Sequence, residues 1–465
     1  MILYKIKIFD IDSLNNIRKR IFFSIVIFIL FFSIVIFKIS NVMIFSNFEI
    51  NTKGITSKNI ERGKIFDRNG VLLASTIKSY SLFAHPKKIK KIDELSSNLE
   101  KILLIPKKTI KSKLSSDVNF VWIKRKISPK QHQKIINLGQ VGLQTKIENM
   151  RVYPYKSISS HVVGFTNIDG LGLSGIERGM EKKLSRGENI HLSIDSRLQN
   201  SIRKELIETI DKFHAKSGLT IIVDIKSGEI LGLVNFPDFN PNNINKILPK
   251  TQFNMSTQGV YEMGSTFKPL TMAIGYDKKI IDSELKIDVS KPIKFGKFLI
   301  EDFEKHEGKL DVKGIIVKSS NIGAAKIANK IGKKNQIEYF KKFDFFEKID
   351  LELKETAKPI IPKNWKKLET MTIGYGYGFA ITPLHLCKAY IPLVNGGYKT
   401  KLTLLKNKNK NDLKKILKSS TSEEVKKLLR SVILESKYTG PKAKVEGYEI
   451  GGKTGTAELI DKTGR

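Results

Sequence analysis

The sequence predicts an α+β protein carried by one N-terminal membrane helix, and three observations support this prediction. An apolar run occupies residues 21–37. Two apolar halves separated by a short polar turn occupy residues 218–234, which is the pattern of a β-hairpin. A mainly helical stretch follows, and then a late strand at 451–457. Strands and helices that occur in separate runs favour an α+β domain over an alternating one.

The apolar run is long enough to cross a bilayer. It is interrupted by only two serines and continues to residue 45 beyond Lys38. It is preceded by a basic flank that consists of Lys5, Lys7, Arg18, Lys19 and Arg20. Such a flank stays on the cytoplasmic side of the membrane. The run ends in bulky residues, whereas a cleaved signal ends in small ones. We therefore expect a cytoplasmic tail over 1–20 and an uncleaved anchor over 21–45, with a buried core helix as the alternative.

The region after the anchor contains turn signals and a long helical stretch. Asp67-Arg68-Asn69-Gly70 predicts a hairpin turn, with 71–74 as the returning strand. Residues 87–140 are lysine-rich and helical in character, and we interpret Ser96-Ser97-Asn98 within them as a helix cap or surface turn. His161 has no serine or carboxylate partner in a nearby motif, so we expect a structural role for it.

The pattern changes at about His191, where the second half of the chain begins. A helix over 196–213 follows, with its apolar residues on one side: Leu198, Ile202, Leu206 and Ile210. The hairpin comes next and is apolar enough to be central in a sheet. We expect the late strand through Lys453 to pair beside it. The lysine- and asparagine-rich segment 405–418 is predicted to be a solvated loop.

The composition describes a basic chain without disulfides. Among 465 residues there are 82 Lys and Arg against 46 Asp and Glu, a formal net charge of +36. Anionic lipid, an acidic polymer or nucleic acid could match such an excess. The lysines are scattered and no nucleic-acid-binding motif accompanies them, so a lysine-rich proteome is the simplest explanation. Cys387 is the only cysteine. We expect no nucleic-acid partner, no metal and no cofactor.

The candidate chemistry centres on Tyr261–Pro269. Proline is tolerated only in the first turn of a helix, so Pro269 predicts a helix that begins at about Ser265. Lys268 lies three residues on, on the same face. A lysine kept neutral by burial or by a second cation can remove the serine proton. The Ser-x-x-Lys pattern also occurs by chance in this chain, at Ser75, Ser201 and Ser283.

Two later motifs distinguish Ser265 from these other serines. Ser319-Ser320-Asn321 follows, and then Lys453-Thr454-Gly455-Thr456. This three-part order resembles the penicillin-binding proteins and serine β-lactamases. Further stretches resemble the class B penicillin-binding proteins: 62–70, 151–154, 161–165, 170–177 and 374–386. The last of them resembles the division-associated branch. Within the last stretch we expect Gly374–Gly378 to shape the floor of the cleft. Residues 192–195 resemble the entry strand of the family's catalytic domain, so we expect a strand there.

The resemblance implies a catalytic role for three of these side chains. Ser265 would attack a D-alanyl-D-alanine stem peptide and form an acyl-enzyme. Lys268 is the favoured base for this step, although the base is disputed in related enzymes. Ser319 would relay a proton to the leaving nitrogen.

The same resemblance implies the substrate-binding residues. Asn321 would bind the substrate backbone and Lys268, and Lys453 with Thr454 would bind the substrate carboxylate. Gly455 would leave room for substrate, and the N–H groups of Ser265 and Thr456 would form the oxyanion hole. A second Lys-Thr-Gly at 462–464 lies in a polar turn and is rejected.

The resemblance also implies an architecture and a biological setting. It indicates a β-rich pedestal over 46–190 and a transpeptidase domain of the serine β-lactamase type over 191–465. The implied function is septal peptidoglycan cross-linking at the bacterial inner membrane, with the catalytic domain in the periplasm. The implied partners are stem peptides, the lipid-linked precursor, β-lactams, a membrane glycosyltransferase and other division proteins. An elongation-type enzyme, a membrane-attached β-lactamase and an inactive division scaffold remain alternatives.

The C-terminus carries one further expectation. The sequence ends at Arg465, soon after the third motif, whereas the family continues with further strands and a closing helix. A strand there would have an unpaired edge. We therefore predict that the sequence is truncated.

Overall fold

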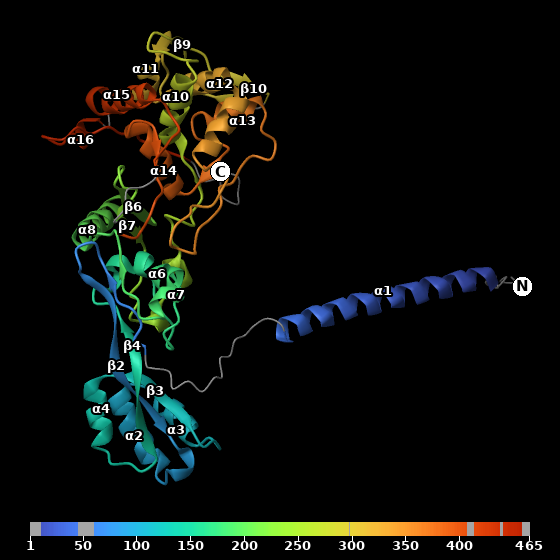
Figure 1. The fold of residues 1–465 in the computed structure, drawn as a ribbon, viewed down its shortest axis with the longest axis vertical. Helices are drawn as coiled ribbons and strands as arrows, with labels where there is room; N and C mark the ends of the chain where they lie inside the picture. The colour runs from blue at the N-terminus through green and yellow to red at the C-terminus, as the bar shows by residue number, and fades with distance from the viewer. Residues whose placement is uncertain (1–10, 45–59, 297, 407–412, 438–439, 458–465) are drawn as a thin grey trace, which may run out of the picture. The chain divides into compact units, whose positions relative to one another are not determined.

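The computed structural model describes residues 11–44, 60–296, 298–406, 413–437 and 440–457 (Figure 1). The chain divides into two compact units, 1–59 and 60–465. The first contains α1 (Ile11–Ile44). Its segment Arg18–Lys38 is long and apolar enough to span a membrane. The predicted helix is thus confirmed, while residue 45 of the expected anchor lies outside the described residues.

The first part of the second unit is a sheet built around β2 (Leu72–Ala84). β2 pairs antiparallel with β3 (Val121–Ile127), with β4 (Leu143–Val152) and with the short β1 (Ile65–Phe66). β1 pairs in parallel with β5 (Ile190–His191). Helices α2 (Ile92–Leu103), α3 (Lys107–Leu114) and α4 (Pro129–Ile136) share an apolar core with β2 and β3. This region supplies the β-rich pedestal.

Local sequence signals predict only part of the structure in this region. The turn at Asn69 is confirmed, because Asp67 Oδ1 accepts hydrogen bonds from the N–H groups of Asn69 and Val71, each at 2.8 Å. The lysine-rich helical stretch also contains β3, which was missed. The cap assigned to Ser96 and Ser97 is wrong. Both lie inside α2, where their hydroxyls donate to carbonyls four residues earlier, a bond available within a helix.

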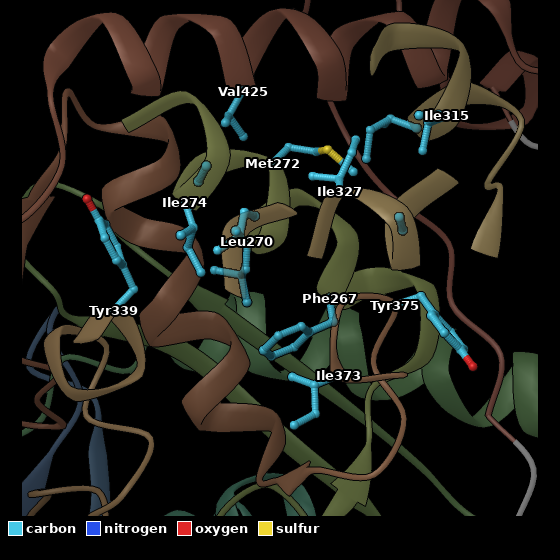
Figure 2. Packing of buried hydrophobic residues seen from close by; sticks show 14 of the residues in the cluster. Phe267, Leu270, Met272, Ile274, Ile315, Ile327, Tyr339, Ile373, Tyr375 and Val425 are labelled. Atoms are coloured by element: carbon cyan, nitrogen blue, oxygen red, sulfur yellow. The ribbon is translucent and has the colours of Figure 1, made fainter. Parts of the chain in front are cut away.

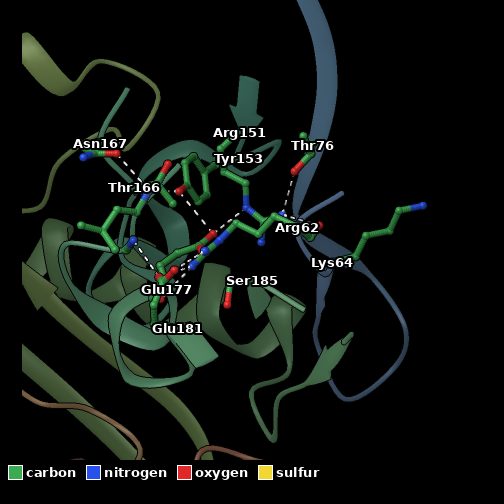
Figure 3. Close-up of polar contacts among 12 residues, drawn as sticks. Arg62, Lys64, Thr76, Arg151, Tyr153, Thr166, Asn167, Glu177, Glu181 and Ser185 are labelled. Carbon is green, nitrogen blue, oxygen red and sulfur yellow. Dashed lines mark hydrogen bonds and ion pairs between the residues drawn. The ribbon is translucent and has the colours of Figure 1, made fainter. Parts of the chain in front are cut away.

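A buried ion network joins three separate segments of the chain (Figure 3). Glu177 is fully buried on α6 (Gly175–Gly179). Its carboxylate accepts from Arg62 Nε and Arg151 Nε, each at 2.7 Å, and from the Tyr153 hydroxyl at 3.3 Å. Arg62 also contacts Glu181 on α7 (Glu181–Leu184) at 2.8 Å. The motif around residue 62 therefore has a structural role, because Arg62 links these segments.

The second part begins with a helix laid across a hairpin. α8 (Ser196–Phe213) has the predicted bounds and is capped by Asp195. β6 (Gly218–Val223) and β7 (Ile230–Phe236) form the predicted hairpin. Apolar side chains of α8 lie close to Gly218 and Gly232, as the predicted apolar face requires. The strand expected at 192–195 is mostly wrong, because β5 ends at residue 191 and Asp195 instead caps α8.

The centre of this part is α10 (Lys268–Asp277), which is buried on nearly all sides. It contacts α12 (Asn321–Lys342), α14 (Pro383–Val394) and α15 (Ser419–Glu435). Figure 2 shows Leu270, Met272 and Ile274 in the cluster that these helices form. A helix that is apolar all round belongs in a core. The residues just before α10 are therefore held by a rigid element.

The remaining elements are short. They are η1 (Pro86–Lys88), η2 (Lys156–Ser159), α5 (Ser160–Val163), η3 (Ile244–Lys246), α9 (Pro249–Gln252), β8 (Tyr261–Glu262), η4 (Gly264–Phe267), β9 (Lys286–Asp288), β10 (Ile293–Phe295), β11 (Phe298–Ile300), β12 (Lys309–Asp311), α11 (Val312–Val317), α13 (Lys367–Ile373), β13 (Ala380–Ile381), β14 (Tyr398–Lys399), β15 (Lys414–Lys415) and α16 (Gly440–Ala443).

Two predictions for the late segments are wrong. Residues 451–457 form no strand, and among the described residues β6 and β7 pair only with each other. Gly452 N–H instead donates to Leu429 O on α15 at 3.0 Å, so its backbone is bonded to a helix. The predicted loop 405–418 includes β15, which pairs with β14, and its residues 416 and 417 are buried. Residues 407–412 of that segment lie outside the described residues.

Candidate active site

Ser265 lies in a 3₁₀ turn immediately before the buried helix. The turn is η4 and α10 begins only at Lys268, three residues later than predicted, with Pro269 in its first turn. In a 3₁₀ turn, side chains three residues apart eclipse one another. Lys268 is therefore placed directly beside the serine, with Nζ 2.9 Å from Ser265 Oγ.

Lys268 is fully buried and surrounded by oxygen atoms. Its Nζ contacts the carbonyl of Ser319, Ser319 Oγ at 3.1 Å and Asn321 Oδ1 at 2.9 Å. Burial, followed by the charge of Lys453, holds the pKa of Lys268 well below its ordinary value, while the charge of Asp302 acts in the opposite direction.

These contacts suit a neutral amine. A neutral lysine has two hydrogens and one lone pair. The Ser319 carbonyl and Asn321 Oδ1 can only accept, so they take the two hydrogens. The lone pair then remains for a serine hydroxyl, and Ser265 Oγ lies at hydrogen-bonding distance. This arrangement allows Lys268 to withdraw the proton of Ser265.

The second motif is a sharp turn between two helices. Ser319 follows α11 in the left-handed backbone region, at φ +57°, which is uncommon for a serine. Ser320 caps α12, because its Oγ accepts from Gly323 N at 2.9 Å. The turn presents both the carbonyl and the hydroxyl of Ser319 to the same amine.

Asp302 holds this turn and was missed in the sequence. Its carboxylate accepts from Ser320 Oγ at 2.6 Å, from Ile322 N at 2.9 Å and from Asn321 N. A carboxylate at the N-terminus of α12 also complements the helix dipole. A single aspartate 18 residues before Ser320 belongs to no local pattern, so only the folded chain reveals its position.

The third motif brings a second cation to the same place. Lys453 Nζ lies 2.9 Å from Ser319 Oγ and 3.0 Å from Thr454 O. Burial lowers the pKa of Lys453 to about 8. The Ser319 hydroxyl therefore lies within hydrogen-bonding distance of both lysines, and three distant segments of the chain meet around it.

The backbone of the third motif packs against the turn that carries Ser265. A Cβ added to Gly455 would lie 2.7 Å from Thr266 Cγ2 and 2.9 Å from Met263 O. The missing side chain thus makes room for the turn, and the interpretation that it leaves room for substrate stays a prediction. Thr454 and Thr456 are exposed.

The loop Gly374–Gly378 contacts both segments. Gly264 N–H donates to Gly376 O at 3.1 Å, and the Tyr377 hydroxyl donates to Thr456 O at 3.1 Å. A side chain at Gly376 would collide with the backbone of Gly264, so the close approach requires a glycine. The loop therefore packs against both segments, and its role as the floor of a cleft stays a prediction.

Other sequence candidates lie away from this cluster. His161 is buried and bonds Thr251 O at 2.9 Å, which confirms a structural role. Ser75 belongs to β2, and Ser201 is exposed on α8. The rejected motif at 462–464 lies outside the described residues. In the described part of the chain, no three His, Cys, Asp or Glu side chains are grouped so that they could hold a metal ion.

A serine hydroxyl beside a buried lysine of lowered pKa, with a second serine, an amide and a second lysine around them, defines a serine acyl-transfer site. The model of the family described as "Penicillin binding protein transpeptidase domain" matches residues 218–465, and that described as "Penicillin-binding Protein dimerisation domain" matches 57–221. The chain belongs to the penicillin-binding protein family, in its class B branch of FtsI type.

Relatives extend the similarity over most of the chain. It is 32% identical over 409 residues to the "Probable peptidoglycan D,D-transpeptidase FtsI" of Caulobacter vibrioides, covering 86% of this chain and 69% of the relative. It is 30% identical over 436 residues to the "Probable peptidoglycan D,D-transpeptidase PenA" of Neisseria gonorrhoeae, covering 85% and 74%. It is 26% identical over 439 residues to the "Peptidoglycan D,D-transpeptidase FtsI" of Escherichia coli K12, covering 87% and 74%. The apolar α1 fits a single-pass membrane protein of this type. The truncation stays a prediction.

Proposed function

We propose that this chain is a serine-type peptidoglycan D,D-transpeptidase that cross-links stem peptides during septal wall synthesis and is acylated by β-lactams. The observation that carries the proposal is the 2.9 Å contact between Ser265 Oγ and the fully buried Nζ of Lys268. The names of the FtsI and PenA relatives, which are peptidoglycan D,D-transpeptidases, support the same reaction.

The acylation step follows from the contacts. Ser265 Oγ attacks the carbonyl carbon of the D-alanyl-D-alanine bond while its proton passes to Lys268 Nζ. The N–H groups of Ser265 and Thr456 stabilise the oxyanion, by about 3 kcal/mol per donor. The Ser319 hydroxyl, in contact with Nζ, then passes a proton to the leaving amine as the C–N bond breaks. Attack by the amine of a second stem peptide reverses these transfers and frees Ser265.

Substrate binding uses the surrounding polar groups. Lys453 and Thr454 bind the carboxylate of the substrate, and the Asn321 amide orients the substrate backbone. The backbone of Gly455 and Thr456 lies beside the scissile bond. The positive charge of Lys453 also favours the neutral form of Lys268, because like charges oppose each other.

The proposal also includes the membrane orientation, the domain bounds and the partners of the chain. The basic residues that flank the apolar part of α1 on its N-terminal side support a cytoplasmic N-terminus and a periplasmic catalytic domain. The pedestal spans 46–190 and the transpeptidase domain 191–465. The partners are the lipid-linked precursor, a membrane glycosyltransferase and other division proteins. No specific observation favours an elongation enzyme, a β-lactamase or an inert scaffold instead.

Labelling with a fluorescent penicillin tests the proposal. The full chain in mild detergent is expected to form a covalent adduct, and Ser265→Ala is expected to abolish it. Ser201→Ala is the matched control, because Ser201 also begins a Ser-x-x-Lys pattern but is exposed on α8. Labelling that survives in Ser265→Ala would show that another residue is the nucleophile. An unlabelled wild-type chain would favour the scaffold, and rapid release of the label would favour a β-lactamase.

The pH profile of acylation is expected to be bell-shaped. The rate should rise with pH as Lys268 loses its proton, because burial and Lys453 depress its pKa. The rate should fall as pH rises through about 8, because Lys453 then loses the charge that binds the carboxylate. Stopped-flow acylation rates across this range measure both limbs. In Lys453→Arg, whose side chain stays charged, the alkaline limb should move upward. An unchanged alkaline limb would contradict the role of Lys453.

A further inference from the structure

One of the two N–H groups expected in the oxyanion hole belongs to Thr456, which lies on an exposed segment. Residues 454–457 are exposed and form no strand. Among the described residues, none accepts a hydrogen bond from the Thr456 N–H, so this group remains available to a ligand. A donor of this kind stabilises an oxyanion most when it is fixed before the reaction starts. The backbone of Thr456 therefore needs a contact that holds it in place.

Tyr377 supplies such a contact. Its hydroxyl donates to Thr456 O at 3.1 Å. In the part of the chain that the structure describes, no other group from outside the segment 453–457 bonds the backbone of residues 454–457. Only two soft torsions separate the carbonyl and the N–H group of one residue. A bond that fixes the carbonyl of Thr456 therefore also restricts the direction of its N–H group.

The backbone of Thr456 also lies beside the turn that carries the nucleophile. A Cβ added to Gly264 would lie 2.3 Å from Thr456 O and 3.4 Å from Thr456 N. Gly264 directly precedes Ser265 and has a φ of +50°, in the left-handed region that favours glycine. The carbonyl that Tyr377 holds is thus packed against the residue next to the nucleophile.

The ring of Tyr377 is itself held in place. It packs against the ring of Tyr375, with 5.4 Å between the two centroids, and Tyr375 is buried in the same core cluster as α10. The next residue, Gly378, donates its N–H to Glu262 Oε1 at 2.7 Å, just before the turn that carries Ser265. The hydroxyl of Tyr377 is therefore placed by the same rigid core that places the nucleophile.

We propose that Tyr377 is a positioning residue for acyl transfer, whose hydroxyl holds Thr456 so that the Thr456 N–H is directed at the oxyanion. This inference rests on the proposed function, because the oxyanion arises only when Ser265 attacks a carbonyl carbon. The hydroxyl acts through Thr456 and touches no reacting atom. Its removal is expected to weaken the stabilisation of the tetrahedral intermediate and to leave the initial binding of the ligand unchanged.

The variant Tyr377→Phe tests the inference, because it removes the hydroxyl and keeps the ring. Stopped-flow acylation of the full chain in mild detergent, at increasing penicillin concentrations, separates the affinity of the initial complex from the rate constant of acylation. We expect the rate constant to fall about tenfold, as for the loss of one hydrogen bond, and the affinity to stay the same. Tyr398→Phe is the matched control, since it removes the same hydroxyl from a tyrosine on β14 whose ring contacts Lys415.

The carbonyl stretch of the penicilloyl ester gives a second readout, which a loss of stability alone would not change. Infrared difference spectra with an isotope-labelled carbonyl report the hydrogen bonds to the ester oxygen. The band is expected at higher wavenumber in Tyr377→Phe than in Tyr398→Phe, and the melting temperature shows that both variants are folded. A folded Tyr377→Phe chain that is acylated as fast as the control, or whose band does not shift, would overturn this inference alone. A wild-type chain that forms no acyl-enzyme would overturn the proposed function and this inference together.

Discussion

Replacing Lys268 with methionine is expected to lower the rate of acylation by a penicillin about 10²- to 10⁴-fold, the usual contribution of a positioned base. Methionine has a similar length and fills the fully buried position without a charge. Ser265 would keep its place in the 3₁₀ turn and lose the group that takes its proton. The measurement is the second-order rate of labelling by a fluorescent penicillin.

The control is Lys204→Met. Lys204 also follows a serine by three residues, but its side chain is 72% exposed on α8. It should label at the wild-type rate, and both variants should melt near the wild-type temperature. The acid limb of the pH profile should also disappear in Lys268→Met. A folded Lys268→Met chain that labels as fast as the control would mean that another group is the base.

Replacing Glu177 with alanine is expected to lower the free energy of unfolding by about 3–5 kcal/mol, the usual cost of removing one partner of a buried ion pair. Glu177 is fully buried, and its loss leaves the guanidinium groups of Arg62 and Arg151 without their shared carboxylate. Chemical denaturation of the full chain, followed by the fluorescence of its two tryptophans, Trp122 in β3 and Trp365, measures the effect.

Asp117→Ala is the matched control for this prediction. Asp117 also forms an ion pair, with Lys87 at 3.2 Å, but its side chain is 93% exposed. Exposed pairs contribute about 0–1 kcal/mol, so this variant should be near the wild type. If Glu177→Ala unfolded at the same denaturant concentration as Asp117→Ala, the buried ion network would not stabilise the fold.

The sequence by itself determined the features that depend on contiguous residues. The membrane-length helix, the turn at Asn69, the helix over 196–213 and the hairpin after it all follow from local spacing of apolar and turn residues. The order of the three motifs was also sufficient to identify the family. These predictions hold in the folded chain because each depends on contacts within one short segment.

Tertiary structure decided everything that depends on a distant partner. Residues 451–457 have a strand-like sequence, yet they form no strand and Gly452 bonds to α15, since a strand forms only where another strand supplies its ladder. The position of Asp302 at the turn before α12 comes from a segment with no pattern of its own. The lowered pKa of Lys268 arises from burial and from a lysine far along the chain. Lys268 and Lys453 could be identified from the sequence, whereas Asp302 could not. For all three, only the packing around α10 sets the distances and the dielectric environment on which their chemistry depends.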